Sequence, residues 1–215
     1  SMSAADWRGA ADAIGRAAAK GPVAVVIDSA YAAYGPEKGV LGPITALEAV
    51  ADRALVLVAW SASKTFTHYG LRVGALVALV PDAAERARIG AALTYACRGT
   101  WSNCNRGGMA AITRLLVEKP LREAVDAERA ILVRLLNERV DAFNAAAAHH
   151  RLRHPRYDGG FFVTVFTDDA DGAALRMKAD GVFVVPIEGA LRLGLCSTAK
   201  GDVVRLVEST ARAIR

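Results

Sequence analysis

The chain has 215 residues, which is enough for one large domain or two small ones. Hydrophobic residues make up 53% of it and charged residues 23%, a composition typical of a folded protein with a core. The net charge is +5, but the basic residues form no dense run interleaved with aromatics, so nucleic acid is not an expected partner. No apolar run is long enough to span a membrane and no signal-peptide pattern opens the sequence, so we expect a cytoplasmic protein without a membrane partner. The cysteines Cys97, Cys104 and Cys196 predict neither a disulfide framework nor a metal site, because their number is odd and their spacing does not suit a metal.

The first half of the chain alternates between helical and strand patterns. Residues 6–20 predict an amphipathic helix, which Gly21-Pro22 ends. Three continuous apolar runs follow, and the β-branched first run is typical of a buried parallel strand. The sequence thus predicts strands at 23–27, 54–60 and 73–80, a loop at 31–43 and a short helix at 44–51. Strand, helix and strand in this order predict an α/β architecture with a mainly parallel sheet.

The second half of the chain begins with helical patterns and changes character after residue 155. The predicted helices are 82–96, 109–118 and 121–148, with a polar loop at 97–108. The buried stripe of the long helix is expected to contain Ile131, Leu135, Leu136 and Phe143. Short strands are predicted at 161–166, 182–186 and 191–195, and a closing helix at 202–214. We therefore expect residues 1–125 to be part of a large α/β domain and residues 126–215 to form a small α+β domain.

Polar side chains stand where the predicted strands end, which is the edge at which open α/β sheets bind ligands. Asp28 ends the first strand, and Ser61, Ser63 and Lys64 follow the second. A lysine amine becomes a nucleophile toward an aldehyde when burial or nearby positive charge keeps it unprotonated, and Arg72 follows Lys64 by eight residues. Hydroxyls together with a guanidinium suit a phosphate monoester. An isolated Lys64 would be read as a surface lysine after a strand, but these neighbours favour a binding site.

Asp28 and Tyr31 add a carboxylate and a phenol after the neighbouring strand. A carboxylate keeps a pyridine nitrogen protonated by charge pairing. A protonated pyridine ring is an electron sink. The two strand ends together therefore offer groups for an aldehyde, a phosphate and a pyridine nitrogen.

Three short motifs carry these groups in a fixed order: Asp28-x-Ala30-Tyr31, Ser61-x-Ser63-Lys64 and Arg72-Val73-Gly74. Their order and spacing resemble the fold type I pyridoxal-phosphate enzymes, specifically the class I aminotransferases that include the aspartate and aromatic amino acid enzymes. The resemblance implies that Asp28 pairs with the pyridine nitrogen, Tyr31 with the ring hydroxyl, Ser61, Ser63 and Arg72 with the phosphate, and that Lys64 carries the cofactor as a Schiff base and transfers the proton.

Two later segments extend the resemblance over nearly the whole chain. Residues 191–195 resemble the segment whose arginine grips the substrate α-carboxylate, which would make Arg192 that residue. Residues 98–103 resemble the loop that reaches across a homodimer, where Arg98 would meet a second substrate carboxylate. Phe162 resembles the aromatic that lines the substrate pocket. Simpler interpretations stay open: a surface salt bridge for Arg192 and an ordinary core position for Phe162.

The sequence also departs from the family pattern. Thr67 and His68 stand where small and apolar residues are usual, and Cys104 stands where proline is common. The family's phosphate-binding turn, its cofactor-stacking aromatic and its Asn-Pro-x-Gly segment would all precede residue 1. We therefore expect the chain to be the C-terminal portion of such an enzyme, with the N-terminal half of the enzyme missing.

The resemblance implies an aminotransferase that moves an amino group between an L-amino acid and a 2-oxo acid, with pyridoxal 5′-phosphate on Lys64. Aspartate and aromatic amino acids are the candidate donors, and a homodimer is expected. A pyridoxal-phosphate lyase of the same fold, a ligand-sensing regulator domain and an inactive fragment stay open as alternatives.

His149, His150 and His154 could suggest a metal cluster, but a solvated helix end explains them better because Pro155 follows and no carboxylate accompanies them.

Overall fold

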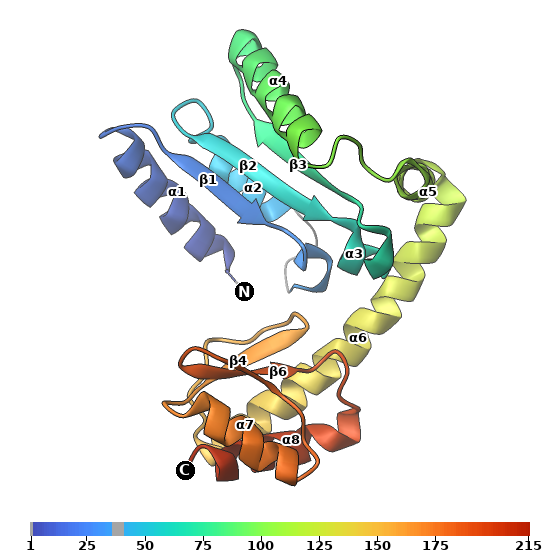
Figure 1. Ribbon diagram of the computed structural model, residues 1–215. Coiled ribbons are helices and arrows are strands. Elements are labelled where there is room, and N and C mark those ends of the chain that lie inside the picture. Colours follow the sequence, from blue (N-terminus) through green and yellow to red (C-terminus); the bar gives the residue numbers. More distant parts are fainter. Residues whose placement is uncertain (1, 36–40) are drawn as a thin grey trace. The chain divides into compact units, whose positions relative to one another are not determined.

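The computed structural model describes residues 2–35 and 41–215, so the predicted loop at 31–43 lies partly outside the described residues. The described chain forms two compact units, each with a three-stranded sheet (Figure 1). The first unit holds residues 2–33 and 41–129, and the second holds residues 34, 35 and 130–215. The division falls inside a long helix, and the domain boundary expected at residue 125 stays a prediction.

The sheet of the first unit brings two strand ends to one edge. Its strands, in spatial order, are β1 (Ala24–Asp28), β2 (Leu55–Ser61) and β3 (Gly74–Leu79). β1 and β2 are parallel, with Asp28 beside Ala59, whereas β2 and β3 are antiparallel, with Ser61 beside Gly74. β1 and β2 therefore end at the same edge at which β3 begins.

Two helices pack against one face of this sheet (Figure 1): α1 (Ala4–Ala18) and α2 (Leu41–Glu48). Ser3 begins α1 with a capping box, in which its hydroxyl accepts the Asp6 N–H at 3.2 Å and the Asp6 carboxylate accepts the Ser3 N–H at 2.7 Å. The shared core contains Ala11, Ile27, Leu47, Val50, Val56 and Val58.

The prediction that the first strand is buried is wrong for part of β1, and β3 is also partly exposed. Val26 of β1 is 64% exposed and Leu76 of β3 is 45% exposed. Successive side chains of a strand point to opposite faces, so these residues lie on the face away from Ile27 and Val58. The described part of the first unit leaves that face partly open, which the apolar composition of a strand cannot reveal.

The further helical segments of residues 32–150 are η1 (Ala32–Tyr34, a 3₁₀ turn), α3 (Ala62–Thr65), η2 (Tyr69–Leu71, a 3₁₀ turn), α4 (Ala83–Thr100), α5 (Arg106–Val117) and α6 (Lys119–His150), of which α6 runs from the first unit into the second. The loop predicted at 97–108 is wrong at both ends. α4 continues to Thr100 and ends where Ser102 adopts a φ of 64°. α5 already begins at Arg106, because the Asn105 side chain accepts the Gly108 N–H at 3.0 Å.

α6 buries a narrower stripe than the sequence predicts. Leu136 and Phe143 are buried as predicted, together with Val140 and Ala147, at the spacing of one helix face. Ile131 and Leu135 are exposed, so their predicted burial is wrong. Leu135 precedes Leu136 by one residue, which places it about 100° around the helix from the buried stripe.

The second unit is a small antiparallel sheet with helices. Its elements are β4 (Phe162–Phe166), α7 (Ala170–Ala179), β5 (Val185–Ile187), β6 (Ala190–Gly194), η3 (Lys200–Asp202, a 3₁₀ turn) and α8 (Val203–Ala213). The strands lie in the order β4-β6-β5, and both pairs are antiparallel. The side chains of Val165, Leu191, Leu193 and Val207 are fully buried in this unit.

Candidate functional site

The end of β1 is fastened to β2 immediately after Asp28. Ser29 is buried, and both its N–H and its hydroxyl donate to the Ala59 carbonyl, at 3.0 and 2.9 Å. Asp28 itself is exposed, and its carboxylate accepts the Ala30 N–H at 2.9 Å. This hydrogen bond therefore fixes the orientation of the Asp28 carboxylate at the edge of the sheet.

The chain turns from β2 into α3 at Ser61, whose hydroxyl accepts the Ser63 N–H at 3.2 Å. This turn places Lys64 at the same edge of the sheet as Asp28. The Lys64 Nζ lies 5.6 Å from the centre of the Tyr31 ring and 4.5 Å from that of the Tyr69 ring. The structure thus brings Lys64 and Tyr31, two of the predicted site residues, together.

Arg72 reaches the same turn from the start of β3. One guanidinium nitrogen donates to the Ser63 hydroxyl at 3.3 Å and to the Tyr69 carbonyl at 3.2 Å. Ser63 is buried, and the Arg72 guanidinium carbon lies 5.5 Å from the Tyr69 ring centre. Lys64 and Arg72 therefore both lie near the ring of Tyr69. Cation–π attraction to this ring favours the placement of each of the two cations there.

The segment between Lys64 and Arg72 has a strained backbone. Thr67 and Arg72 have φ angles of 55° and 53°, in the left-handed region that side chains other than glycine rarely adopt. The Thr67 hydroxyl donates to the Phe66 carbonyl at 2.7 Å. The conformation directs the Arg72 guanidinium toward Ser63. Gly74 follows because a Cβ there would lie 2.7 Å from the Trp60 carbonyl oxygen.

Three residues that hold this segment were not found from the sequence. Tyr69 lies under both cations, and its place between them along the chain could have indicated it. The Asn105 amide donates to the Leu71 carbonyl at 3.0 Å, and the Arg129 guanidinium donates to the Thr65 carbonyl at 3.5 Å. These contacts join residues 34 and 64 positions apart, so no local pattern indicates them.

The structure places Arg98 in the last turn of α4, not in a loop as predicted. Its guanidinium donates to the Ser102 carbonyl and to the Ser102 hydroxyl, both at 3.0 Å. Ser102 has a positive φ and lies where the chain reverses after α4. The two bonds therefore connect this reversal to the end of the helix. Arg98 therefore orders its own loop.

The second unit brings Arg192 and Phe162 together. Arg192 lies on β6 beside Thr164 of β4, and its guanidinium carbon is 3.7 Å from the centre of the Phe162 ring. Both side chains are exposed. A guanidinium stacked on an aromatic face keeps its edge free for a carboxylate.

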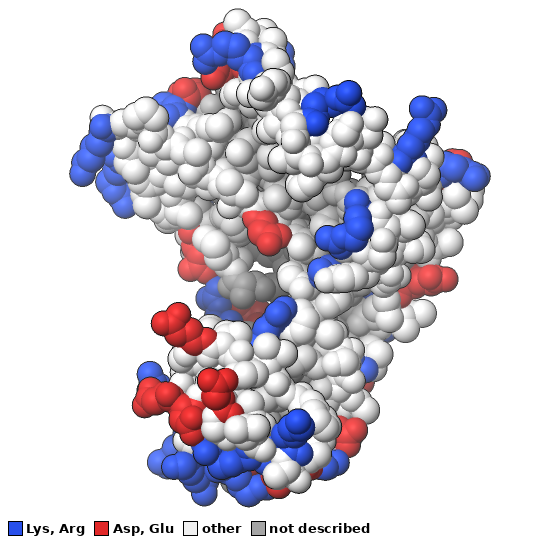
Figure 2. Space-filling model, in the orientation of Figure 1, with Lys and Arg blue, Asp and Glu red and all other residues white. Residues whose placement is uncertain are grey.

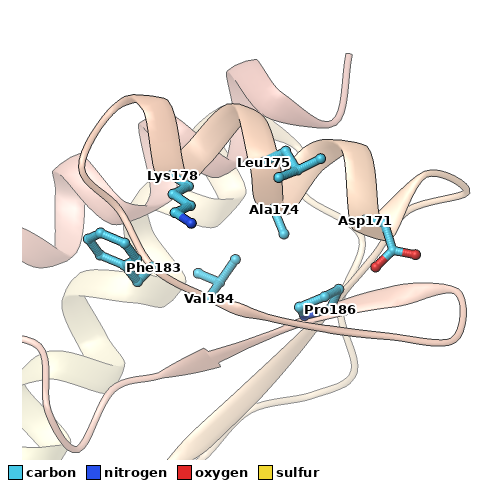
Figure 3. Close-up of a pocket in the computed structure, with 7 residues that line it drawn as sticks. All are labelled: Asp171, Ala174, Leu175, Lys178, Phe183, Val184 and Pro186. Atoms are coloured by element: carbon cyan, nitrogen blue, oxygen red, sulfur yellow. The ribbon is translucent and has the colours of Figure 1, made fainter.

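A pocket of about 280 Å³ lies elsewhere in the second unit (Figure 3). α7 forms one wall, and the segment that leads into β5 forms the other. Its lining is Asp171, Ala174, Leu175, Lys178, Phe183, Val184 and Pro186. None of the predicted site residues lines this pocket.

The described residues show no group of three His, Cys, Asp or Glu side chains that could hold a metal ion. His154 packs instead against Phe143, with ring centres 5.2 Å apart. In residues 2–35 and 41–215, no helix is long and apolar enough to cross a membrane. On the face seen in Figure 2, basic side chains lie over both units and are mixed with acidic ones.

Comparisons with known proteins give one matching family model and several solved structures of the same fold. A family model described as aminotransferase class I and II matches residues 7–209. A search of curated proteins finds no match. An aminotransferase structure from Anaerococcus prevotii is 24% identical with a TM-score of 0.89, covering 100% of this chain and 53% of that one.

Two further solved structures have the same fold. A tetra mutant of Thermus thermophilus aspartate aminotransferase, complexed with tryptophan, is 22% identical with a TM-score of 0.71, covering 95% of this chain and 52% of that one. An aromatic-amino-acid aminotransferase from Burkholderia pseudomallei, covalently bound to pyridoxal phosphate, is 21% identical with a TM-score of 0.71, covering 100% and 53%. The chain spans about half the length of these solved structures. By its match over residues 7–209, the chain belongs to the aminotransferase class I and II family.

Proposed function

We propose that the chain is part of a pyridoxal-phosphate-dependent aminotransferase and that its first unit holds the cofactor at the sheet edge formed by Asp28, Ser61 and Lys64. The observation that carries the proposal is the grouping of Lys64, Tyr31, Ser63 and Arg72 around one turn. The family match and the covalently bound pyridoxal phosphate of the Burkholderia relative support it.

The donor set at this edge suits a phosphorylated pyridine aldehyde. Ser63 and Arg72 are already hydrogen-bonded to each other, so a phosphate could accept from both without a large rearrangement. Ser61 would add a second hydroxyl. Asp28, at the end of the adjacent strand, would pair with the pyridine nitrogen, and the Tyr31 phenol would reach the ring hydroxyl.

When bound, the cofactor supplies an aldehyde and a ring that withdraws electrons from the substrate α-carbon. Lys64 would hold it covalently through Nζ. When an amino acid displaces Lys64, the freed amine would take the proton from the substrate α-carbon, acting as a base. It would then return the proton to the cofactor carbon, acting as an acid. Asp28 would keep the ring nitrogen protonated throughout, and Tyr31 and Tyr69 would restrict the movement of the Lys64 side chain.

The substrates would be an L-amino acid and a 2-oxo acid. In the second unit, Arg192 would receive the α-carboxylate, and its stacking on Phe162 would orient the guanidinium edge. Arg98 would receive a second carboxylate, which favours aspartate and other dicarboxylates. Transfer is preferred over a lyase reaction because all three of the solved structures described above are aminotransferases.

The chain would share its active site with further polypeptide, because the relatives are about twice as long. A homodimer and a cytoplasmic location are parts of the proposal that rest on the family resemblance. The phosphate-binding turn and the ring-stacking aromatic expected upstream of residue 1 would complete the cofactor contacts.

The test is to add pyridoxal phosphate, reduce with borohydride, and digest with trypsin. Trypsin does not cleave after a modified lysine. An adduct on Lys64 should therefore join residues 54–64 and 65–72 into one peptide that carries the cofactor. The same protocol should be applied to the chain alone and to a polypeptide that includes the remainder of the enzyme.

Two variants make the test specific. Lys64→Arg keeps the charge but cannot form the bond, so it should give no adduct at this position. Arg72→Met should weaken labelling by pyridoxal phosphate but not by pyridoxal, because only the former carries the phosphate. An adduct that persists on the Lys64→Arg protein, or that forms on another lysine of the unaltered protein, would contradict the assignment.

A further inference from the structure

Arg139 of α6 holds the segment that follows β6 in the second unit. One of its guanidinium nitrogens, Nη1, donates to the Leu195 carbonyl at 3.0 Å and to the Cys196 carbonyl at 2.7 Å. Hydrogen bonds from a charged donor are stronger than those from a neutral one. The end of β6 is therefore fixed to the long helix at two neighbouring carbonyls.

The same segment is joined to the start of β4. The Cys196 N–H donates to the Phe161 carbonyl at 3.2 Å, and the next residue, Phe162, begins β4. The Arg192 guanidinium carbon lies 3.7 Å from the centre of the Phe162 ring. Arg139 thus holds, directly or through Cys196, the two strands that carry the stacked pair.

Stability alone does not explain an arginine at position 139. Its Nε is buried and has no hydrogen-bond partner within residues 2–35 and 41–215. A buried donor without a partner costs free energy, so an apolar side chain of similar length would fill the same space at a lower cost. What the arginine adds are the two bonds to the Leu195 and Cys196 carbonyls.

We propose that Arg139 is a positioning residue for the carboxylate site at Arg192, because it fixes the ends of β4 and β6 and so maintains the stacking of Arg192 on Phe162. The inference rests on the proposed function, in which Arg192 receives the substrate α-carboxylate. A guanidinium that is already held in place loses less freedom when a carboxylate binds to it. Loss of the Arg139 bonds should therefore lower the affinity of the site for carboxylates.

The experiment measures how well pyruvate, a 2-oxo acid with a single carboxylate, protects Arg192 of the 215-residue chain from phenylglyoxal. Trypsin does not cleave after a modified arginine, so modification of Arg192 joins residues 179–192 and 193–200 into one peptide. The pyruvate concentration that halves the rate of modification gives an apparent Kd. Arg139→Met should raise this Kd by about 2- to 30-fold, the range for residues that act on a site without touching its ligand.

Glu138→Gln is the matched control. Glu138 forms an exposed ion pair with Lys200, Oε2 to Nζ at 3.0 Å, which also joins α6 to the segment after β6. Exposed pairs contribute little, so this variant should leave the Kd for pyruvate unchanged. Arg139→Lys keeps a charged donor for the two carbonyls and should give a Kd between those of the unaltered chain and Arg139→Met, which a merely space-filling role would not produce.

Circular dichroism identifies the variants that fold, and Arg139→Lys decides the question if Arg139→Met does not. Equal protection by pyruvate in the unaltered chain and in every folded Arg139 variant would overturn the inference, even if the variants melt at lower temperatures. Absence of protection in the unaltered chain would instead overturn the assignment of Arg192 to the carboxylate under the proposed function, and the role of Arg139 would fall with it.

Discussion

Gly74 begins β3 beside Ser61 of β2, and replacing it with alanine should destabilise the first unit. The added Cβ would lie 2.7 Å from the Trp60 carbonyl oxygen, whereas ordinary contacts begin at 3.4 Å. The neighbour is backbone of a paired strand, so it cannot rotate away, and β2 and β3 must separate by about 0.7 Å. Overpacking of this kind costs about 1–3 kcal/mol.

The assay is urea unfolding followed by tryptophan fluorescence. All three tryptophans, Trp7, Trp60 and Trp101, lie in the first unit, so the signal reports on the unit that is perturbed. The free energy of unfolding of Gly74→Ala should fall by about 1–3 kcal/mol relative to the unaltered chain.

Gly90→Ala is the control, since Gly90 lies within α4 and its added Cβ meets nothing within 4 Å. It should raise the free energy of unfolding by about 0.5–1 kcal/mol, because alanine loses less backbone entropy than glycine in a helix. A Gly74→Ala protein as stable as the unaltered chain would refute the steric argument. A loss of equal size in both variants would show that the assay does not detect the local contact.

Two further predictions concern ionisable groups. Hydrogen bonds from Arg212 and then Ser209 hold the pKa of Asp180 below its ordinary value of 3.8. The stabilisation by Asp180 is therefore present above that pH and lost as the pH falls through the lower, folded-state pKa. The melting temperatures of the unaltered chain and Asp180→Asn should differ at pH 6 and converge in strong acid; a constant difference would contradict the linkage. Cys97→Ala should speed the alkylation of Cys104 by iodoacetamide at pH 8, because it removes the hydrogen bond and the charge that raise the pKa of Cys104; an unchanged or slower rate would contradict this.

Local sequence patterns predict the elements of this chain well where the cause is local. The apolar runs that become β1, β2 and β3 and the polar residues at their ends are visible in the sequence because strand ends and turn chemistry depend on neighbouring residues. The structure brings Lys64 and Arg72 to the same Tyr69 ring, and Arg72 also donates to the Ser63 hydroxyl.

Features that depend on distant contacts could not be predicted in this way. The exposure of Val26 depends on which elements cover the sheet, not on the composition of the strand. The support of the motif turn by Asn105 and Arg129 depends on how α5 and α6 return to it. The predicted helix ends at residue 96, whereas α4 continues to Thr100. The hydrogen bonds from Arg98 to Ser102 stabilise this helix end, and the polar composition of the segment does not reveal them.

Under the proposed function, in which Arg72 binds the cofactor phosphate, its backbone conformation sets stability to heat against affinity for the cofactor. Its φ of 53° suits glycine or asparagine better than arginine, yet arginine is the residue that reaches Ser63. Directed evolution that selects only for survival on heating is therefore expected to enrich glycine at position 72. Such variants would pass a thermal screen and fail an affinity screen, so library designs for this chain should keep position 72 constant.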